Sequence, residues 1–214
     1  MNETVIRPYS PRDRRAVREI AWDTAFLGHS GGAFFTDKPL LQDFLTAYFT
    51  DYEPQSCFVA ECSGEVVGYL LGAVDERRMG EACRGRLVWS LLARFLLCDV
   101  FRPKNIIFVL RMIRSWARGE FRGEQFYPEY PAILHINLKE GFRGHGTGSR
   151  LIAAYLAYLK AGNVPAVRLA TMTAKGAAFF EKQGFVLLSR HMRSYFRALT
   201  GADTVVSIYG KKLL

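Results

Sequence analysis

The chain has 214 residues, of which 50 % are hydrophobic and 23 % are charged, as in an ordinary globular protein with a sizeable core. No apolar stretch is long enough for a membrane-spanning helix, and the N-terminus lacks a secretory pattern, so we expect a cytoplasmic location. The formal net charge of +9 favours anionic partners: nucleic acid, an acidic membrane surface or a polyphosphate cofactor.

The first 75 residues predict two helices and three strands. We expect strands at 5–8, 57–62 and 65–71, and helices that begin near Pro11 and Pro39. Ser63 and Gly64 stand between the last two strands and are typical of a two-residue hairpin turn.

From about 76 to 130 the character of the sequence changes. The stretches 87–101 and 106–116 are strongly apolar, interrupted by arginines and separated by Pro103, which predicts two helices. Packed helices with snorkelling arginines are one interpretation. Peripheral contact with a membrane surface, or a subunit contact in a homodimer, is the other, since basic amphipathic helices favour such surfaces.

The last third alternates strands with helices. We expect strands at 133–138, 167–170, 185–195 and 205–209, and helices at 147–160 and 175–183. Gly184 follows the second helix, as a C-terminal cap does. The four cysteines, Cys57, Cys62, Cys83 and Cys98, form no C-x-x-C pair, so we expect reduced thiols and no metal.

A glycine-rich loop joins one of these strands to the helix that follows. Arg143-Gly144-His145-Gly146-Thr147-Gly148 lies between the strand at 133–138 and the helix at 147–160. Helix N-termini attract phosphates, glycines let the backbone approach them closely, and Arg143 adds a cation. The loop therefore predicts a pyrophosphate site. A Walker loop is excluded because Gly148-Ser149-Arg150 lacks the lysine, and alternate glycines do not fit the dinucleotide pattern.

The pattern R-x-x-G-x-G between a strand and a helix resembles the coenzyme A signature of the GNAT superfamily of N-acetyltransferases. Residues 134–148 are similar to that family's fourth strand and pyrophosphate loop, and 178–185 is similar to its F-Y-E-K-x-G-F element. Arg7-Pro8, 68–75 and 130–138 further resemble bacterial acetyltransferases similar to the acetyltransferase-like domain of O-GlcNAcase enzymes.

The resemblance implies an α/β (α+β) GNAT fold: a mixed, mostly antiparallel central sheet flanked by helices, forming one domain over 1–214 with a helical insertion at about 76–130. It also implies N-acetyltransferase activity, with acetyl-CoA as co-substrate and a small-molecule or peptide amine as acceptor. The residues that it implies for coenzyme binding are Leu138, Arg143, Gly144, His145, Gly146, Thr147, Gly148, Ser149, Thr173 and Phe179.

Two positions depart from the family pattern. Family members often carry Asn where this chain has Thr173, and Tyr where it has Phe180. That tyrosine commonly protonates the departing thiolate, which phenylalanine cannot do. Tyr195 or water is then expected to take the role, or the thiolate leaves unaided because its pKa is only about 8.5.

The resemblance further implies direct attack of a neutral amine on the thioester, with a backbone N–H near Leu138 stabilising the oxyanion. A base is useful because the pKa of a lysine-like amine is about 10.4. His135 and Asp75 are the main candidates for this base, while we expect Glu140 to be a turn residue. Asn137 shares a face of its strand with His135 and is a candidate for binding the acceptor.

Two other classes of function remain open from the sequence. Phe180 and Thr173 leave room for a GNAT-fold module that binds CoA without catalysis. The basic charge leaves room for a nucleic-acid binder, but the sequence contains no helix-turn-helix, RNP-type or zinc-finger pattern, so no specific nucleic acid is expected.

Overall fold

The computed structural model describes residues 3–99, 101–122 and 126–213. Within them one seven-stranded sheet has the order β1-β2-β3-β4-β5-β7-β6. Its strands are β1 (Thr4–Pro8), β2 (Phe58–Cys62), β3 (Glu65–Ala73), β4 (Ala132–Leu138), β5 (Ala166–Thr171), β6 (Val186–Arg193) and β7 (Thr204–Lys212). The helices are α1 (Arg14–Thr24), α2 (Lys38–Ala47), α3 (Glu76–Ala82), α4 (Val88–Arg94), α5 (Pro103–Ala117), α6 (Thr147–Ala161), α7 (Ala174–Lys182) and α8 (Arg197–Thr200).

Neighbouring strands are antiparallel except β4 and β5, which run parallel. This confirms the predicted mixed, mostly antiparallel sheet. The β2–β3 hairpin closes at the predicted turn, where Ser63 and Gly64 have φ of 51° and 81°. Two successive positive φ values are typical of a type I′ turn, whose twist matches that of the paired strands.

The central strand β4 pairs unequally with its two neighbours. It is aligned with β3 from Ile133 to Leu138. With β5 it is aligned only at Ala132 and Ile133, and the described residues contain no further β4–β5 pair. The two strands therefore separate beyond Ile133, and the β5-facing edge of β4 is left open toward its C-terminal end.

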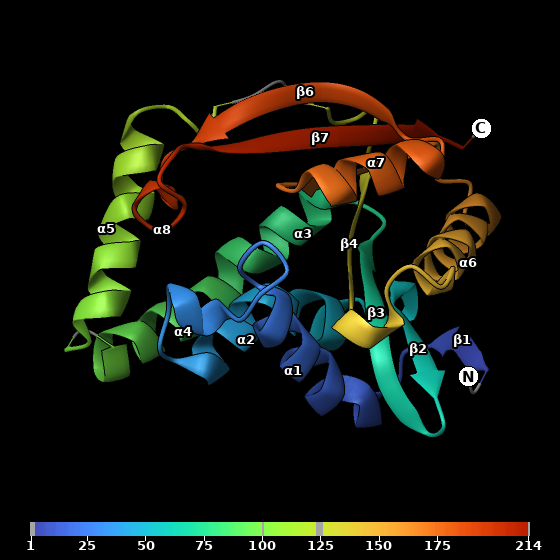
Figure 1. The fold of residues 1–214 in the computed structure, drawn as a ribbon, viewed down its shortest axis with the longest axis horizontal. Coiled ribbons are helices and arrows are strands. Elements are labelled where there is room, and N and C mark those ends of the chain that lie inside the picture. The colour runs from blue at the N-terminus through green and yellow to red at the C-terminus, as the bar shows by residue number, and fades with distance from the viewer. Residues whose placement is uncertain (1–2, 100, 123–125, 214) are drawn as a thin grey trace.

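Helices cover both faces of the sheet (Figure 1). α6 packs against β1 to β4 and buries Leu151 and Ile152 in the main core. α1 packs on β3 and β4 from the opposite face, where Val17 and Ile20 cluster with Tyr69. Apolar residues three or four apart give each helix one buried stripe, which explains why the sequence pattern located both.

The insertion contains α3, α4 and α5, and it runs from α3 in the middle of the molecule to α5 at one end (Figure 1). Leu91 of α4 and Phe108 of α5 pack against a cluster that contains Phe34 and Phe196. Pro103 separates two helical stretches, as predicted, but the second helix begins at Pro103 and not at 106. Proline is favoured at the first helical position, because the N–H group that it lacks has no partner within the helix there. In the described part of the chain, we find no helix with both the length and the apolar character needed to cross a membrane.

Candidate active site

The glycine-rich loop leads from the end of β4 into α6 (Figure 1). Gly144 and Gly146 have φ of 84° and 79°, which L side chains rarely adopt. A Cβ on either residue would meet nothing within 4 Å. Conformation, not crowding, therefore requires glycine at both positions. His145 between them is exposed.

The first turn of α6 presents backbone donors at this loop. Gly146 is the N-cap, and among the described residues no side chain caps the helix. Thr147 and Gly148 are buried in the first turn, and Ser149 is half-buried. Because free N–H groups and the positive end of the helix dipole attract anions, this geometry suits a pyrophosphate.

Arg143 connects three parts of the site. Its Nε donates to the carbonyl oxygen of Leu138 at 3.0 Å, and its Nη2 donates to that of Gly28 at 3.4 Å. Gly28 lies in the segment between α1 and α2, 115 positions away in the chain. Both acceptors are neutral, so neither bond cancels the positive charge of the guanidinium.

The pairing of β4 with β3 fixes the direction of its peptide groups. Lys139 donates its N–H to the carbonyl oxygen of Val67 at 2.9 Å, so in antiparallel alternation the odd-numbered residues of β4 exchange bonds with β3. The N–H groups of Ile136 and Leu138 consequently point to the other edge, where β5 has moved away. Sequence reasoning named Leu138 but missed Ile136.

His135 and Asn137 lie together on the face of the sheet that α1 covers. The Asn137 side-chain nitrogen donates to the Tyr69 hydroxyl oxygen at 2.9 Å and lies 3.1 Å from Nε2 of His135. Tyr69 is fully buried and directly opposite Asn137 in the β3–β4 register. The sequence pattern did not single out Tyr69, because this relationship depends on the alignment of two strands.

Burial decides the charge of His135. The side chain is only partly exposed, and its removal from water lowers the pKa of the imidazole to about 4. His135 is therefore neutral near pH 7. If the Asn137 amide donates to Nε2, as the hydrogen-bond network assigns, the ring proton is on Nδ1.

Asp75 lies at the other end of β4. It is the N-cap of α3, and its carboxylate accepts from the N–H groups of Arg77 and Arg78. The adjacent Glu76 donates its N–H to the carbonyl oxygen of Pro131, just before β4 begins. At about 3.3 Å per residue, Asp75 is roughly 20 Å from Leu138 along the strand. The structure does not bring it together with His135.

Tyr195 lies beside the end of β5. Its side chain is 8 % exposed, and its hydroxyl contacts Sδ of Met172, the residue after β5, at 3.9 Å. Burial raises the pKa of the Tyr195 hydroxyl. The hydroxyl therefore stays protonated at neutral pH and can donate a proton only at an unfavourable equilibrium.

Three further positions lie on or next to α7. Thr173 and Phe179 were predicted to bind the coenzyme, and Phe180 departs from the family pattern. Thr173 is the N-cap of α7, and the Thr173 hydroxyl accepts from the N–H of Gly176 at 3.0 Å. Phe179 reaches the coenzyme loop, since a Cβ on Gly148 would lie 3.1 Å from its ring. Phe180 is 6 % exposed and packs against Phe185, so it serves the core.

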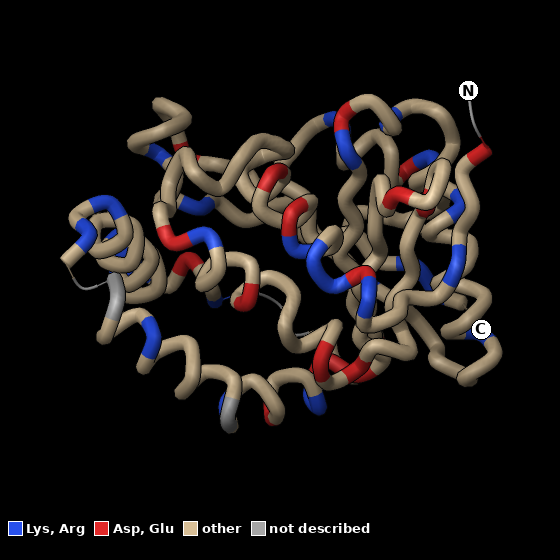
Figure 2. Tube along the Cα trace, turned by 90° about the horizontal axis from the view of Figure 1, so that it is seen from below, with Lys and Arg blue, Asp and Glu red and all other residues tan. Residues whose placement is uncertain are grey.

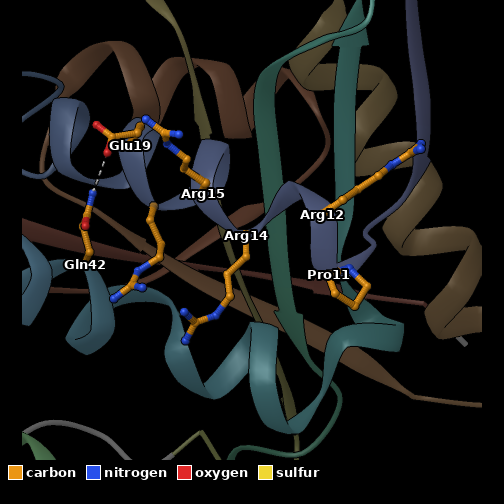
Figure 3. A pocket seen from close by; sticks show the side chains of 7 residues that line it. Pro11, Arg12, Arg14, Arg15, Glu19 and Gln42 are labelled. Atoms are coloured by element: carbon orange, nitrogen blue, oxygen red, sulfur yellow. Dashed lines mark hydrogen bonds between the residues drawn. The ribbon is translucent and has the colours of Figure 1, made fainter.

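Two surface pockets lie away from all of these residues. One of about 310 Å³ is over the start of α1 and is lined by four arginines, Pro11, Glu19 and Gln42 (Figure 3). Arg14 and Arg18, two of these arginines, pair with Asp43, and Glu19 accepts from Gln42. The other, of about 590 Å³, lies between α2 and α4. Neither contains a residue that the sequence predicts for the site.

The acetyltransferase (GNAT) family model matches residues 14–185 of this chain. The chain therefore belongs to the GNAT family of acetyltransferases, as the coenzyme loop predicted. It is 28 % identical over 162 residues to an uncharacterized N-acetyltransferase of Methanocaldococcus jannaschii, a match that covers 65 % of this chain and 95 % of that protein. It is also 24 % identical over 157 residues to protein O-GlcNAcase of Mus musculus, covering 73 % of this chain but only 17 % of the mouse protein.

Solved structures agree with this assignment. The crystal structure of SsHAT superposes with a TM-score of 0.75 at 26 % identity and covers 99 % of both chains. The structure of yncA from Salmonella typhimurium, solved with its cofactor acetyl-CoA, has a TM-score of 0.58 at 13 % identity over 100 % of this chain and 95 % of that one. At that identity the second comparison concerns the fold alone.

Proposed function

We propose that this chain is an N-acetyltransferase in which an amine attacks the thioester of acetyl-CoA directly. The observation that carries the proposal is the open edge of β4, which ends at a positive-φ glycine loop and a helix N-terminus. One end of this continuous surface suits a thioester, and the other suits a pyrophosphate. Family membership supports the same activity.

The chain's residues fit the coenzyme. Backbone N–H groups from Gly144 to Ser149 and the uncapped start of α6 would hold the pyrophosphate, with Arg143 adding positive charge. The Leu138 N–H faces the open edge and would hold the pantetheine arm, while Phe179 of α7 borders the loop. Thr173 is the N-cap of α7, and its contact with the coenzyme stays a prediction. The coenzyme supplies an activated acetyl thioester.

The Ile136 N–H is suited to stabilising the oxyanion. It points to the open edge, and its neighbours in the strand are His135 and Asn137. A carbonyl bound there is within about one residue step of both polar side chains. A fixed N–H that meets developing negative charge lowers the barrier without reorganising in the transition state.

His135 would receive the proton of the attacking amine at Nε2, in place of the hydrogen bond from the Asn137 amide, and pass it to water. It is neutral near pH 7 and can accept a proton, but burial makes the imidazolium unstable, so the proton is not retained. The amine nitrogen forms the new C–N bond, the C–S bond breaks, and CoA leaves as thiolate. Water or Tyr195 would then protonate that thiolate. Asp75, which caps α3, is too remote for either role.

The acceptor would approach from the α1–α2 face, where His135 and Asn137 lie. The insertion reaches this region, because Phe108 and Met112 of α5 pack on the same cluster as Met172, the residue that follows β5. We therefore propose that the insertion shapes the acceptor site for a small-molecule or peptide amine. Homodimer formation stays a prediction.

Release of CoA thiol from acetyl-CoA, measured across a panel of polyamines, amino acids and N-terminal peptides, tests the proposal. Amine-dependent release that His135→Gln reduces would support it. Tight CoA binding without release for any amine would instead support the alternative, a GNAT-fold module that binds CoA without catalysis.

A further inference from the structure

The insertion carries an unusually exposed set of large apolar side chains. We call Trp89, Leu96, Leu97, Phe101, Leu110 and Trp116 the insertion patch. Leu97 is 79 % exposed, Phe101 87 % and Trp116 71 %. Single exposed apolar residues are normal, but a concentration of this kind in one segment marks a binding surface.

The exposed apolar residues of α5 do not result from a failure of this helix to pack on the protein. On its inner side, α5 packs Phe108 and Met112, both partly buried, against the cluster that contains Phe34 and Phe196. Ile107, Leu110 and Ile113 recur at three-residue intervals on its outer side and are all about half exposed or more. α5 therefore has two apolar sides. One is used by the core of the protein, and the other is available to something outside it.

Positive charge accompanies the outer side. Arg111, Arg114 and Arg118 recur at helical spacing next to the exposed apolar strip of α5. Figure 2 shows Lys and Arg segments on the helix at the left end. The stretch 84–118 contains eight Lys or Arg residues and one acidic residue. Part of this charge is compensated: Arg94 and Arg102 pair with Asp37, and Arg118 lies 3.9 Å from Glu120.

We propose that the insertion patch docks this protein onto an anionic lipid surface. Apolar side chains with tryptophan among them, next to arginines, are suited to the boundary between headgroups and acyl chains. Acidic lipids attract such a segment. A second copy of the chain fits less well, because a symmetric contact would bring together two copies of the same basic surface. Nucleic acid offers no apolar surface for six large side chains.

Flotation of the full-length protein with vesicles tests this proposal. We expect binding to phosphatidylcholine vesicles that contain phosphatidylserine, little binding to phosphatidylcholine alone, and weaker binding as salt rises. Leu97→Gln should lower the bound fraction at least fivefold, whereas Val186→Gln, an equally conservative change at another exposed aliphatic residue on β6, should not. Arg114→Gln should lower it about fivefold, and Lys160→Gln at the end of α6 should not.

Circular dichroism and CoA affinity must be unchanged in all four variants, because none lies at the coenzyme loop. Absence of binding to phosphatidylserine vesicles at low salt would overturn the proposal, as would binding that Leu97→Gln and Arg114→Gln leave intact. A dimer in solution that Leu97→Gln dissociates, with no vesicle binding, would overturn it in favour of a contact between copies.

Discussion

The N–H of Lys139 donates to the carbonyl oxygen of Val67 at 2.9 Å, and this bond sets the direction of the peptide groups along β4. Because antiparallel pairs alternate, Asn137 and His135 also face β3 with their N–H groups, while Leu138 and Ile136 face away from it. In the described chain, β5 pairs with β4 only at Ala132 and Ile133, so it does not pair with these two donors. One register therefore produces both the β3–β4 pairing and an open edge with two N–H donors.

The first prediction concerns Gly146. Gly146→Val should abolish CoA binding measured by calorimetry, because a β-branched residue at φ of 79° changes the loop that we propose holds the pyrophosphate. Gly64→Val is the matched control: Gly64 has φ of 81°, and a Cβ there also meets nothing within 4 Å, but it lies in the β2–β3 turn. Both variants should lose about 1–3 kcal/mol of stability. Equal CoA affinity in the two would contradict the loop assignment.

A second prediction uses two glycines of β3. A Cβ on Gly68 would lie 2.1 Å from Cδ2 of Leu138, and a Cβ on Gly72 would lie 2.3 Å from the ring of Tyr155. Both Gly→Ala variants should lose about 1–3 kcal/mol through overpacking. Only Gly68→Ala displaces Leu138, so only it should weaken CoA binding. A similar loss of affinity in Gly72→Ala would mean that the effect is merely one of stability.

The third prediction concerns His135. His135→Gln should lower turnover about 10²-fold, the usual effect of removing a positioned proton acceptor. Since the pKa of His135 is about 4, the acidic limb of the wild-type rate profile should lie near pH 4 and vanish in the variant. His191→Gln, on β6, is the control and should retain the wild-type profile. Wild-type turnover in His135→Gln would show that positioning and bulk water suffice.

His135 should also make stability depend on pH. In the unfolded chain its pKa is about 6.5, and in the fold it is about 4, so between these values the unfolded state binds more protons. Its contribution is fully present above about pH 6.5 and is lost as the pH falls toward 4, by at most about 3 kcal/mol. The free energy of unfolding, measured with denaturant across this pH range, should change less steeply with pH in His135→Gln than in the wild type.

Substitutions of Asp75 test whether its carboxylate caps α3 or takes part in catalysis. Asp75→Asn keeps a good N-cap for α3 and should leave both stability and turnover near the wild-type values. Asp75→Ala should lose about 1 kcal/mol of stability, again with turnover retained. If Asp75→Asn stays folded but loses activity, the carboxylate has a chemical role that its position in the fold does not explain.

Local patterns in the sequence predicted much of this structure. The coenzyme loop was recognisable because Gly144 and Gly146 follow a strand and precede a helix, a signal confined to about fifteen residues. The hairpin at Ser63 and Gly64 was predicted because its signal, two turn residues between two strands, is also local. The capping role of Asp75 was not predicted, because the sequence pattern did not indicate the helix at Glu76–Ala82.

Relationships between distant segments were not predictable. Arg143 was expected to offer its charge at the loop, but its bond to Gly28 joins residues 115 positions apart. Tyr69 and Ile136 matter because of strand register, which alternation within a single strand does not reveal. The depressed pKa of His135 likewise depends on burial by elements far away in the chain.

Amide chemical shifts of the ¹⁵N-labelled protein, followed as CoA is added, locate the coenzyme on the protein. We expect the largest shifts at Ile136, Leu138 and the amides from Gly144 to Ser149, with smaller shifts at Asn137 and Lys139, whose N–H groups face β3. Large shifts confined to the arginine-lined pocket over α1, or an absence of shifts at β4 and the loop, would contradict the proposed coenzyme site.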